Sequence, residues 1–208
     1  MATPEKTVIA AFDFDGTLTR RDSLLPFLLH LAGPLRFSGR LAALMPTLGR
    51  YALGRIPNDM AKERLLTAFL AGHPLGALQD NARRFAQRGL PRLLRPDALA
   101  RLDWHRRQGH RCVLVSASLE LYLEPWGQQA GFDHVIASRL EISDDGTATG
   151  RLAGANCFGA EKVARLEQLL GPLERHILYA YGDSRGDREL LLRADYAYFR
   201  RMPQGETP

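Results

Sequence analysis

The sequence predicts an α/β fold in which helices cover both faces of a parallel β-sheet. Two observations lead to this prediction. From Pro96 onward, short apolar, β-branched segments alternate with helical patterns, as is typical of parallel sheets. After a first predicted strand near the N-terminus, a block rich in Leu, Ala, Arg and Gly interrupts this alternation. The block is therefore predicted to be a helical insert.

The individual elements follow from local patterns. The first strand is predicted at 7–13, an apolar run that ends abruptly in acidic residues and glycine. Further strands are predicted at 111–115, 134–137, 177–181 and 196–199, and helices at 96–108, 119–130, 159–170 and 188–193. An Asp-Gly pair between β-prone flanks predicts a β-hairpin at 141–149.

The insert is expected to contain several helices, which the prolines at positions 26, 34, 46 and 57 separate. Asn58 is the predicted N-cap of a helix that extends through Phe69, with Gly72 ending it. Another helix is predicted at 75–88. The chain is accordingly divided into an α/β core of residues 1–19 and 93–208 and a helical domain of residues 20–92.

Composition limits the class of protein only broadly. The net charge of +5 suits nucleic acid, anionic lipid or a phosphorylated substrate and does not choose among them. Two cysteines are too few for a disulfide scaffold. The first seven residues lack a basic region followed by an apolar core, so no signal peptide is expected. No apolar stretch reaches about 18 residues, and a cytoplasmic location is predicted.

Candidate catalytic groups follow three of the predicted strands. Asp13 and Asp15 follow the first, Ser116 follows the second, and Asp183 and Asp187 follow the strand at 177–181. In an open parallel sheet, ligands bind beyond the carboxyl ends of the strands, near the point where strand order reverses. These side chains are therefore expected to meet in one crevice.

The residue types in this set suit phosphate chemistry. Carboxylates such as Asp13, Asp15 and Asp183 are ligands for Mg²⁺, which shares them with substrate phosphate. Ser116 can donate a hydrogen bond to a phosphoryl oxygen, and Lys162 can neutralise its charge. Each feature alone fits an ordinary turn, loop hydroxyl or solvated lysine. Their combination, in this order at these strand ends, indicates a phosphoryl-transfer site.

The motifs resemble those of the haloacid dehalogenase-like phosphatases, most closely the phosphoserine-phosphatase-like subfamily (subfamily IB). The four matching segments are Asp13-Phe-Asp-Gly-Thr-Leu-Thr, Val-Leu-Val-Ser116, Lys162, and Gly-Asp183-Ser-Arg-Gly-Asp187. The resemblance covers nearly the whole chain. It implies a Rossmann-like core with a mobile cap inserted after the first strand, where the helical block lies.

The resemblance also implies roles for the acidic residues. Asp13 would be the nucleophile that forms an aspartyl-phosphate, and Asp15 the general acid and base. Asp183 would bind Mg²⁺ together with Asp13 and the backbone carbonyl of Asp15, and Asp187 would hold the metal's water shell. Ser116 and Lys162 would bind the phosphoryl group.

Two departures from the subfamily bear on the substrate. Ser184 and Gly186 stand where phosphoserine phosphatases usually carry glycine and asparagine. Asp22 stands where they carry a glutamate that binds the substrate's amino group. Asp22 is equally well interpreted as an acid at the start of a helix. A small phosphorylated metabolite is predicted as substrate, with a phosphoserine-like amino-alcohol phosphate favoured.

Two alternative functions remain open at this point. No acidic residue occurs between Asp22 and Asp59, and the segment between them combines leucine-rich stretches with arginines at 36, 40, 50 and 55. The favoured interpretation is a cap with an apolar inner face and a basic rim. Peripheral membrane contact is the alternative, and would suit a lipid phosphatase of the phosphatidylglycerophosphatase type. A basic nucleic-acid-binding module is the third hypothesis, but no recognised motif supports it, so no nucleic-acid partner is expected.

Overall fold

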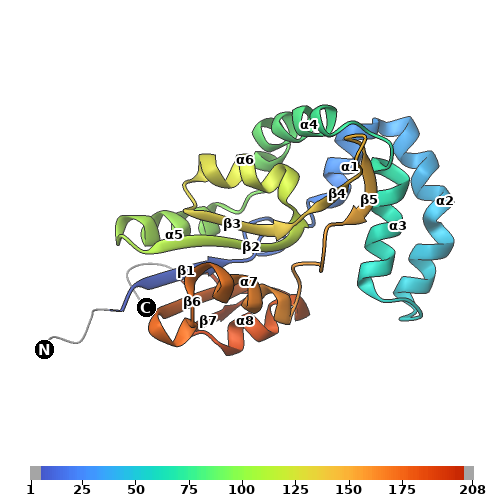
Figure 1. Cartoon of the computed structure of the whole chain (residues 1–208). Coiled ribbons are helices and arrows are strands. Elements are labelled where there is room, and N and C mark those ends of the chain that lie inside the picture. The colour runs from blue at the N-terminus through green and yellow to red at the C-terminus, as the bar shows by residue number, and fades with distance from the viewer. Residues whose placement is uncertain (1–5, 204–208) are drawn as a thin grey trace, which may run out of the picture.

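The computed structural model describes residues 6–203, and a five-stranded sheet lies at the centre of this part of the chain. Its strands are all parallel and follow the order β3-β2-β1-β6-β7 (Figure 1). They are β1 (Val8–Phe12), β2 (Arg111–Leu119), β3 (His134–Ser138), β6 (Ile177–Gly182) and β7 (Tyr196–Phe199). The predicted α/β fold is therefore confirmed.

Helices cover both faces of the sheet. In Figure 1, α5 (Pro96–Arg107) and α6 (Glu120–Ala130) lie on one face, and α7 (Ala160–Leu170) and α8 (Arg188–Leu192) on the other. Successive side chains of β1 point to opposite faces, so Ala10 and Phe12 join one hydrophobic cluster and Ile9 and Ala11 the other. Burial on both sides explains why this strand is almost continuously apolar.

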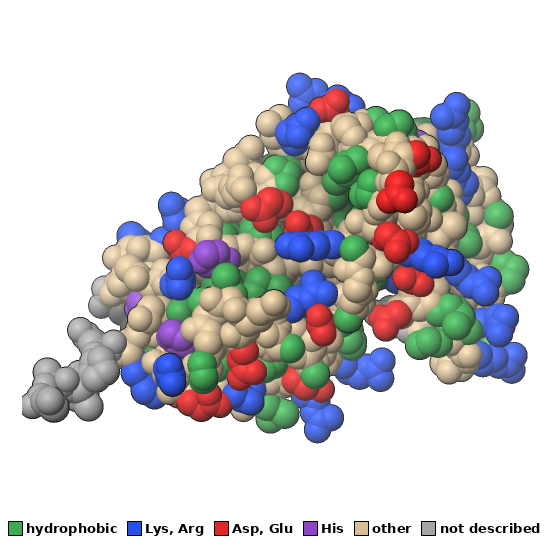
Figure 2. All heavy atoms as spheres, in the orientation of Figure 1, with side chains coloured by type: hydrophobic (Ala, Val, Ile, Leu, Met, Phe, Trp, Pro, Cys, Tyr) green, Lys and Arg blue, Asp and Glu red, His purple; other side chains and the backbone are tan. Residues whose placement is uncertain are grey.

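Four helices lie between β1 and α5, and we call them the insert helices. They are α1 (Leu24–Ala32), α2 (Pro34–Ala52), α3 (Asn58–Leu70) and α4 (Leu75–Arg88). Figure 1 shows α1, α2 and α3 beyond one end of the sheet, whereas α4 lies over α6. Hydrophobic and basic side chains lie together at the end formed by α2 and α3 (Figure 2).

The chain leaves and re-enters the sheet region at one place. Thr19 and Leu94 pair in an isolated β-bridge, and the backbone N–H of Arg20 donates to Leu93 O at 2.8 Å. The insert helices are thus tethered by two adjacent backbone segments. The division into separate domains at 19/20 and 92/93 stays a prediction.

The expectation that prolines separate the insert helices is only partly correct. Pro34 is the first residue of α2 and Pro57 precedes α3, but Pro26 and Pro46 lie within α1 and α2. Pro26 is in the first turn, where a backbone N–H has no helical partner to lose. Pro46 is exposed, so water can bind the carbonyl that it leaves unpaired. The N-cap prediction is wrong by one residue, because Asn58 is the first helical residue and Pro57 holds the cap position.

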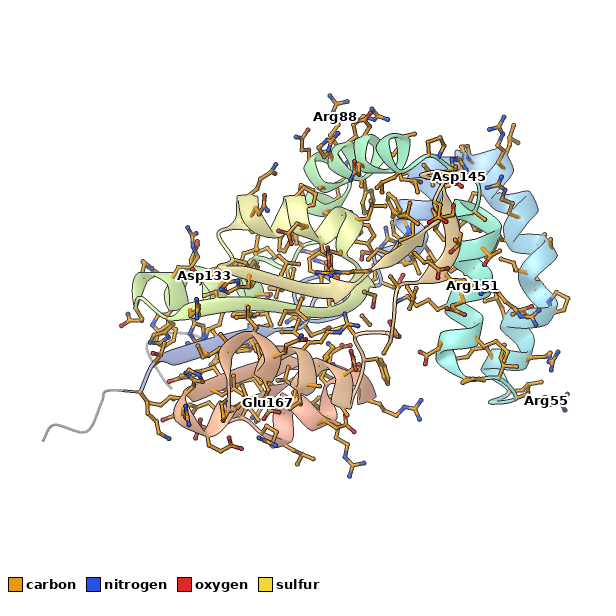
Figure 3. The ribbon with its side chains drawn as sticks, in the orientation of Figure 1. Arg55, Arg88, Asp133, Asp145, Arg151 and Glu167 are labelled. Atoms are coloured by element: carbon orange, nitrogen blue, oxygen red, sulfur yellow. The ribbon has the colours of Figure 1, made fainter. Side chains whose placement is uncertain are left out.

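The predicted hairpin is present as β4 (Leu140–Ile142) and β5 (Ala148–Leu152), which pair antiparallel. It packs against α3, as Figure 1 shows. Gly150 has φ +82°, and a Cβ there would lie 2.3 Å from the Cα of Thr67, so only glycine allows this approach. Asp145 marks the hairpin turn in Figure 3, beside the insert helices.

Strand β2 is longer than the sequence predicts. Strand β2 continues to Leu119, past its predicted end at Val115, with an irregularity in its pairing with β3 between these residues. Among residues 6–203, no helix is both long enough and apolar enough to cross a membrane. Residues 1–5, on which the signal-peptide expectation mainly rests, lie outside the described part.

Candidate active site

The predicted site residues meet where the order of the strands reverses. Strand β1 lies between β2 and β6, with Phe12 in register with Leu114 on one side and Tyr181 on the other. The backbone N–H of Asp13 donates to Tyr181 O at 2.9 Å, so Asp13 follows β1 beside the end of β6, whereas β2 continues to Leu119. The carboxyl ends of β1, β2 and β6 therefore deliver their side chains to one place.

Lys162 lies at the centre of the site. Its Nζ donates to Asp13 Oδ1 at 2.5 Å and to Asp187 Oδ1 at 2.6 Å, and all three side chains are buried. Lys162 comes from the first turn of α7, far from Asp13 in the sequence. One ammonium group thus links the loop after β1 to the loop after β6.

The electrostatics of this cluster are unbalanced. Burial raises the pKa of Asp13 to about 7, against the opposing effect of Lys162. Burial alone would lower the pKa of Lys162, but the carboxylates of Asp13 and Asp187 outweigh it and raise the pKa. The pKa of Asp183 is also raised, by burial and by the charge of Asp187. Asp13, Asp183 and Asp187 lie near one ammonium group, so a further cation would favour the ionised forms of Asp13 and Asp183.

The residues present fit a divalent metal ion. Asp13, Asp183 and Asp187 each offer a carboxylate oxygen, and these oxygens lie within 4.8 Å of one another. Asp183 Oδ1 is buried and has no hydrogen-bond partner among residues 6–203, as a ligand atom would be. Gly16 has φ +80°, and a Cβ there would lie 2.2 Å from Asp183 Oδ2, so glycine leaves room for this carboxylate. Carboxylate oxygens of this kind suit Mg²⁺.

Asp187 is held by hydrogen bonds to both of its carboxylate oxygens. Its Oδ2 accepts hydrogen bonds from the backbone N–H groups of Asp183 and Ser184 and from the Ser184 hydroxyl, at 3.0–3.1 Å. Its Oδ1 accepts from Lys162. Asp187 therefore fixes the loop that presents Asp183, and Ser184 forms a capping box with it.

Asp15 lies apart from the carboxylate cluster and has its own partners. Its Oδ1 accepts from the backbone N–H of Ser23 at 2.8 Å, and its Oδ2 accepts from the hydroxyl of Ser118. Burial raises the pKa of Asp15 to about 6, and the charge of Asp22 adds to the rise. A carboxyl group with this pKa can give and take a proton near neutral pH.

The remaining predicted residues line the same cleft. Ser116 is buried, and its Oγ accepts from the backbone N–H of Ser118 at 3.0 Å, which leaves its own hydroxyl hydrogen available. Asp22 Oδ1 accepts from the backbone N–H groups of Leu24 and Leu25, at 2.9 and 3.2 Å, at the start of α1. The cleft brings together Asp13, Asp15, Asp22, Ser116, Lys162 and Asp183, whereas Asp187 lies behind it.

Sequence reasoning missed two side chains that shape the site. Ser118 follows Ser116 by two residues, and this spacing places both on the same side of an extended strand. Lys62 reaches from α3 to Ala117 O, and also donates to Asn156 Oδ1 at 2.7 Å. Burial lowers the pKa of Lys62 to about 8. The sequence has only three lysines, Lys6, Lys62 and Lys162, and this scarcity is the signal that could have pointed to Lys62.

Comparisons with known proteins identify the family to which the chain belongs. The family model of the haloacid dehalogenase-like hydrolases matches residues 10–192. The chain is 42% identical to protein CicA of Caulobacter vibrioides, over 94% of this chain and 88% of that protein. It is 28% identical to a probable phosphatase of Mycobacterium tuberculosis, over 90% of this chain and 67% of that protein.

A solved structure shares the fold. The substrate-bound phosphoserine phosphatase structure superposes with a TM-score of 0.61 at 17% identity, covering 91% of this chain and 84% of that one. The chain belongs to the haloacid dehalogenase-like hydrolase family. The predicted resemblance and the prediction of an enzyme are therefore confirmed.

Proposed function

We propose that the protein hydrolyses a phosphate monoester with the help of Mg²⁺, by way of a phosphorylated Asp13. The observation that supports this most strongly is the group formed by Asp13, Asp183 and Lys162 at the switch point of the sheet. The family and the phosphatase-named relative support the same chemistry and favour it over nucleic-acid binding.

The chain's own residues divide the reaction into two displacements. In the first, an oxygen of Asp13 attacks phosphorus, the bond to the ester oxygen breaks, and Asp15 gives that oxygen a proton. In the second, Asp15 takes a proton from a water that attacks the phosphoryl group. Phosphate then leaves, and the Asp13 carboxylate is regenerated.

The other residues position the phosphoryl group and balance its charge. Lys162 lies against Asp13, and the Ser116 hydroxyl faces the same cleft, so both can bind phosphoryl oxygens. Asp13 and Asp183 would hold Mg²⁺ with the backbone carbonyl of Asp15, and the ion would neutralise charge that develops on those oxygens. Asp187 would act indirectly, because it fixes the loop that presents Asp183.

The insert helices are proposed to act as a cap over this site. Lys62 already bridges α3 and the end of β2, so the insert closes one side of the cleft. A small phosphorylated metabolite in the cytoplasm is the proposed substrate. Binding of a substrate amine by Asp22 stays a prediction, since one of its oxygens already caps α1.

The test is hydrolysis of simple phosphate monoesters with purified protein. We expect turnover with Mg²⁺, none after EDTA, and recovery when Mg²⁺ is added back. Asp13→Asn should abolish turnover while keeping a cooperative thermal transition, because asparagine can still accept a hydrogen bond from Lys162. Full activity in metal-free buffer would contradict the metal's role, and an active Asp13→Asn variant would contradict the assignment of the nucleophile.

A further inference from the structure

The cleft has two chemically different sides, and its volume is about 690 Å³. One side, here the core wall, carries the residues proposed to do the chemistry: Asp13, Asp15, Ser116, Lys162 and Asp183. The other side, here the insert wall, is a stripe of α2 made of Leu41, Met45, Leu48 and Tyr51. These four residues are three or four positions apart, so they lie along one face of the helix.

Packing within the protein accounts for only part of the insert wall. Phe37 and Leu44, on the neighbouring part of the helix surface, pack against the hydrophobic core, and Leu41 touches it as well. Met45 remains 59% exposed and Tyr51 42% exposed, although both line a cleft. Large apolar side chains that are left open to water inside a cleft are typical of a ligand-binding surface.

Of the polar side chains that line the insert side of the cleft, Lys62 and Asp22 are engaged within the protein, and Arg20 and Arg21 are exposed. Lys62 donates to Ala117 O and to Asn156 Oδ1. Asp22 accepts two backbone hydrogen bonds at the start of α1 through one oxygen. The part of a substrate that extends from the core wall toward α2 would therefore meet mainly apolar surface.

We propose that the substrate is a phosphate monoester whose organic group has a sizeable apolar part, such as an alkyl chain or an aromatic ring, and that this part lies on the insert wall. The inference rests on the proposed phosphatase function and narrows its substrate class. Covering Met45 and Tyr51 would remove their apolar surface from water, so binding would strengthen with the size of the apolar part.

The test compares ethyl, butyl and hexyl phosphate in the presence of Mg²⁺. The alcohols released have nearly the same pKa, so differences in rate do not arise from the leaving group. Each methylene that becomes buried is expected to raise kcat/KM by up to about fourfold. We expect a rise of at least about tenfold from ethyl to hexyl phosphate, and O-phosphoserine should be a poorer substrate than hexyl phosphate.

Matched variants locate the effect. Met45→Ser and Leu48→Ser should flatten the chain-length dependence, with a much larger loss of kcat/KM for hexyl phosphate than for ethyl phosphate. Met60→Ser and Leu53→Ser are the controls, because Met60 and Leu53 are exposed but do not line the cleft. The controls should keep the full chain-length dependence.

The outcomes separate this inference from the proposed function. Turnover with no gain from ethyl to hexyl phosphate would overturn the inference and leave the phosphatase in place. An equal loss of kcat/KM for all three esters in Met45→Ser would also overturn the inference. The insert wall would then help the insert helices close over the site and would not bind the apolar group. No turnover of any ester would overturn the proposed function itself.

A final arm identifies the source of the apolar group. Hexyl phosphate is offered dissolved, below its micellar concentration, and phosphatidic acid is offered in mixed micelles. Cleavage of the dissolved ester alone would support a soluble metabolite with an apolar part. Cleavage of the micellar lipid as well would support the same wall binding an acyl chain.

Discussion

The core wall of the cleft is buried and connected by hydrogen bonds, whereas the insert wall is apolar and partly open to water. Lys162, Asp13 and Asp187 form one ion-paired group, and Ser118 and Ser23 hold Asp15 in place. On α2, Met45 and Tyr51 have no comparable partners within the described part of the chain and retain large exposed fractions. The difference suggests that the core fixes the reaction and the insert selects the substrate.

The largest expected effect concerns proton transfer at the core wall. Asp15→Asn removes the group that we propose protonates the leaving oxygen, so turnover should fall by about 10²–10⁴-fold. The loss should be greater for an alkyl phosphate than for nitrophenyl phosphate, whose leaving group needs no proton. Steady-state rates with both substrates make the measurement, and equal losses would show that Asp15 does not protonate the leaving group.

Lys162→Met tests whether the core wall depends on its single buried ammonium group. Removing one partner of a buried ion pair should cost about 3–5 kcal/mol in the free energy of unfolding. Turnover should fall by about 10²–10³-fold, because phosphoryl oxygens lose a cationic partner. Mg²⁺ should restore part of the stability by balancing Asp13 and Asp183.

The matched control is Lys6→Met, since Lys6 is exposed and donates only to the backbone of Glu174 in the described structure. Lys6→Met should change neither the free energy of unfolding nor the rate of turnover measurably. Urea denaturation with and without Mg²⁺ gives the stabilities. Equal stabilities for Lys162→Met and Lys6→Met would mean that the buried cluster is not held by this ion pair.

A smaller effect is expected where the two walls are joined. Lys62→Met removes the hydrogen bonds from α3 to Ala117 O and Asn156 Oδ1. Because burying the Lys62 charge already has a cost, the net loss should be only about 1 kcal/mol, or roughly a fivefold increase in local opening. Amide hydrogen exchange in α3 measures it. Unchanged exchange in α3 would show that Lys62 does not fasten the insert to the core.

An effect that develops only in acid lies away from the cleft, on the face of the sheet that α5 covers. His105 is buried, contacts the Tyr181 hydroxyl and His110 at 2.8 Å each, and faces Arg101 and Tyr179. Burial, with the charges of Arg101 and His110, lowers the pKa of His105 from 6.5 to about 3. Between these values the unfolded chain binds the proton more strongly, so stability should decrease as the pH falls from 6.5 toward 3.

His105→Gln isolates this contribution, because glutamine can still hydrogen-bond but does not titrate in this window. The free energy of unfolding of the variant should depend less steeply on pH than that of the wild type. Denaturant unfolding at several pH values measures both slopes. Identical slopes would show that His105 does not contribute to acid sensitivity.

The sequence predicted the core wall much better than the insert wall. Asp13, Ser116 and Asp183 could be placed together because the ends of parallel strands converge by topology alone. The position of Lys62, and the stripe from Leu41 to Tyr51, depend on how the insert helices pack against the sheet. No local pattern encodes that packing, since apolar residues on α2 serve both the core and the cleft.

The prolines and the hairpin show the same limit of prediction from local sequence patterns. Pro46 was expected to end a helix, but its exposed position lets α2 continue through it. The turn at 141–149 was visible as Asp-Gly, yet its contact with α3 depends on Gly150 fitting against Thr67, far away in the sequence. Local propensities therefore predicted the elements, and long-range contacts decided how they meet.

The proposed phosphorylation of Asp13 is tested most directly by capturing the phosphoryl group on the enzyme. Wild-type protein is mixed with Mg²⁺ and a reactive aryl phosphate, quenched in acid within milliseconds, digested and analysed by mass spectrometry. We expect one added phosphoryl group on the peptide that contains Asp13, and none in Asp13→Asn. Burst turnover with that peptide unmodified, or the label on another residue, would contradict it.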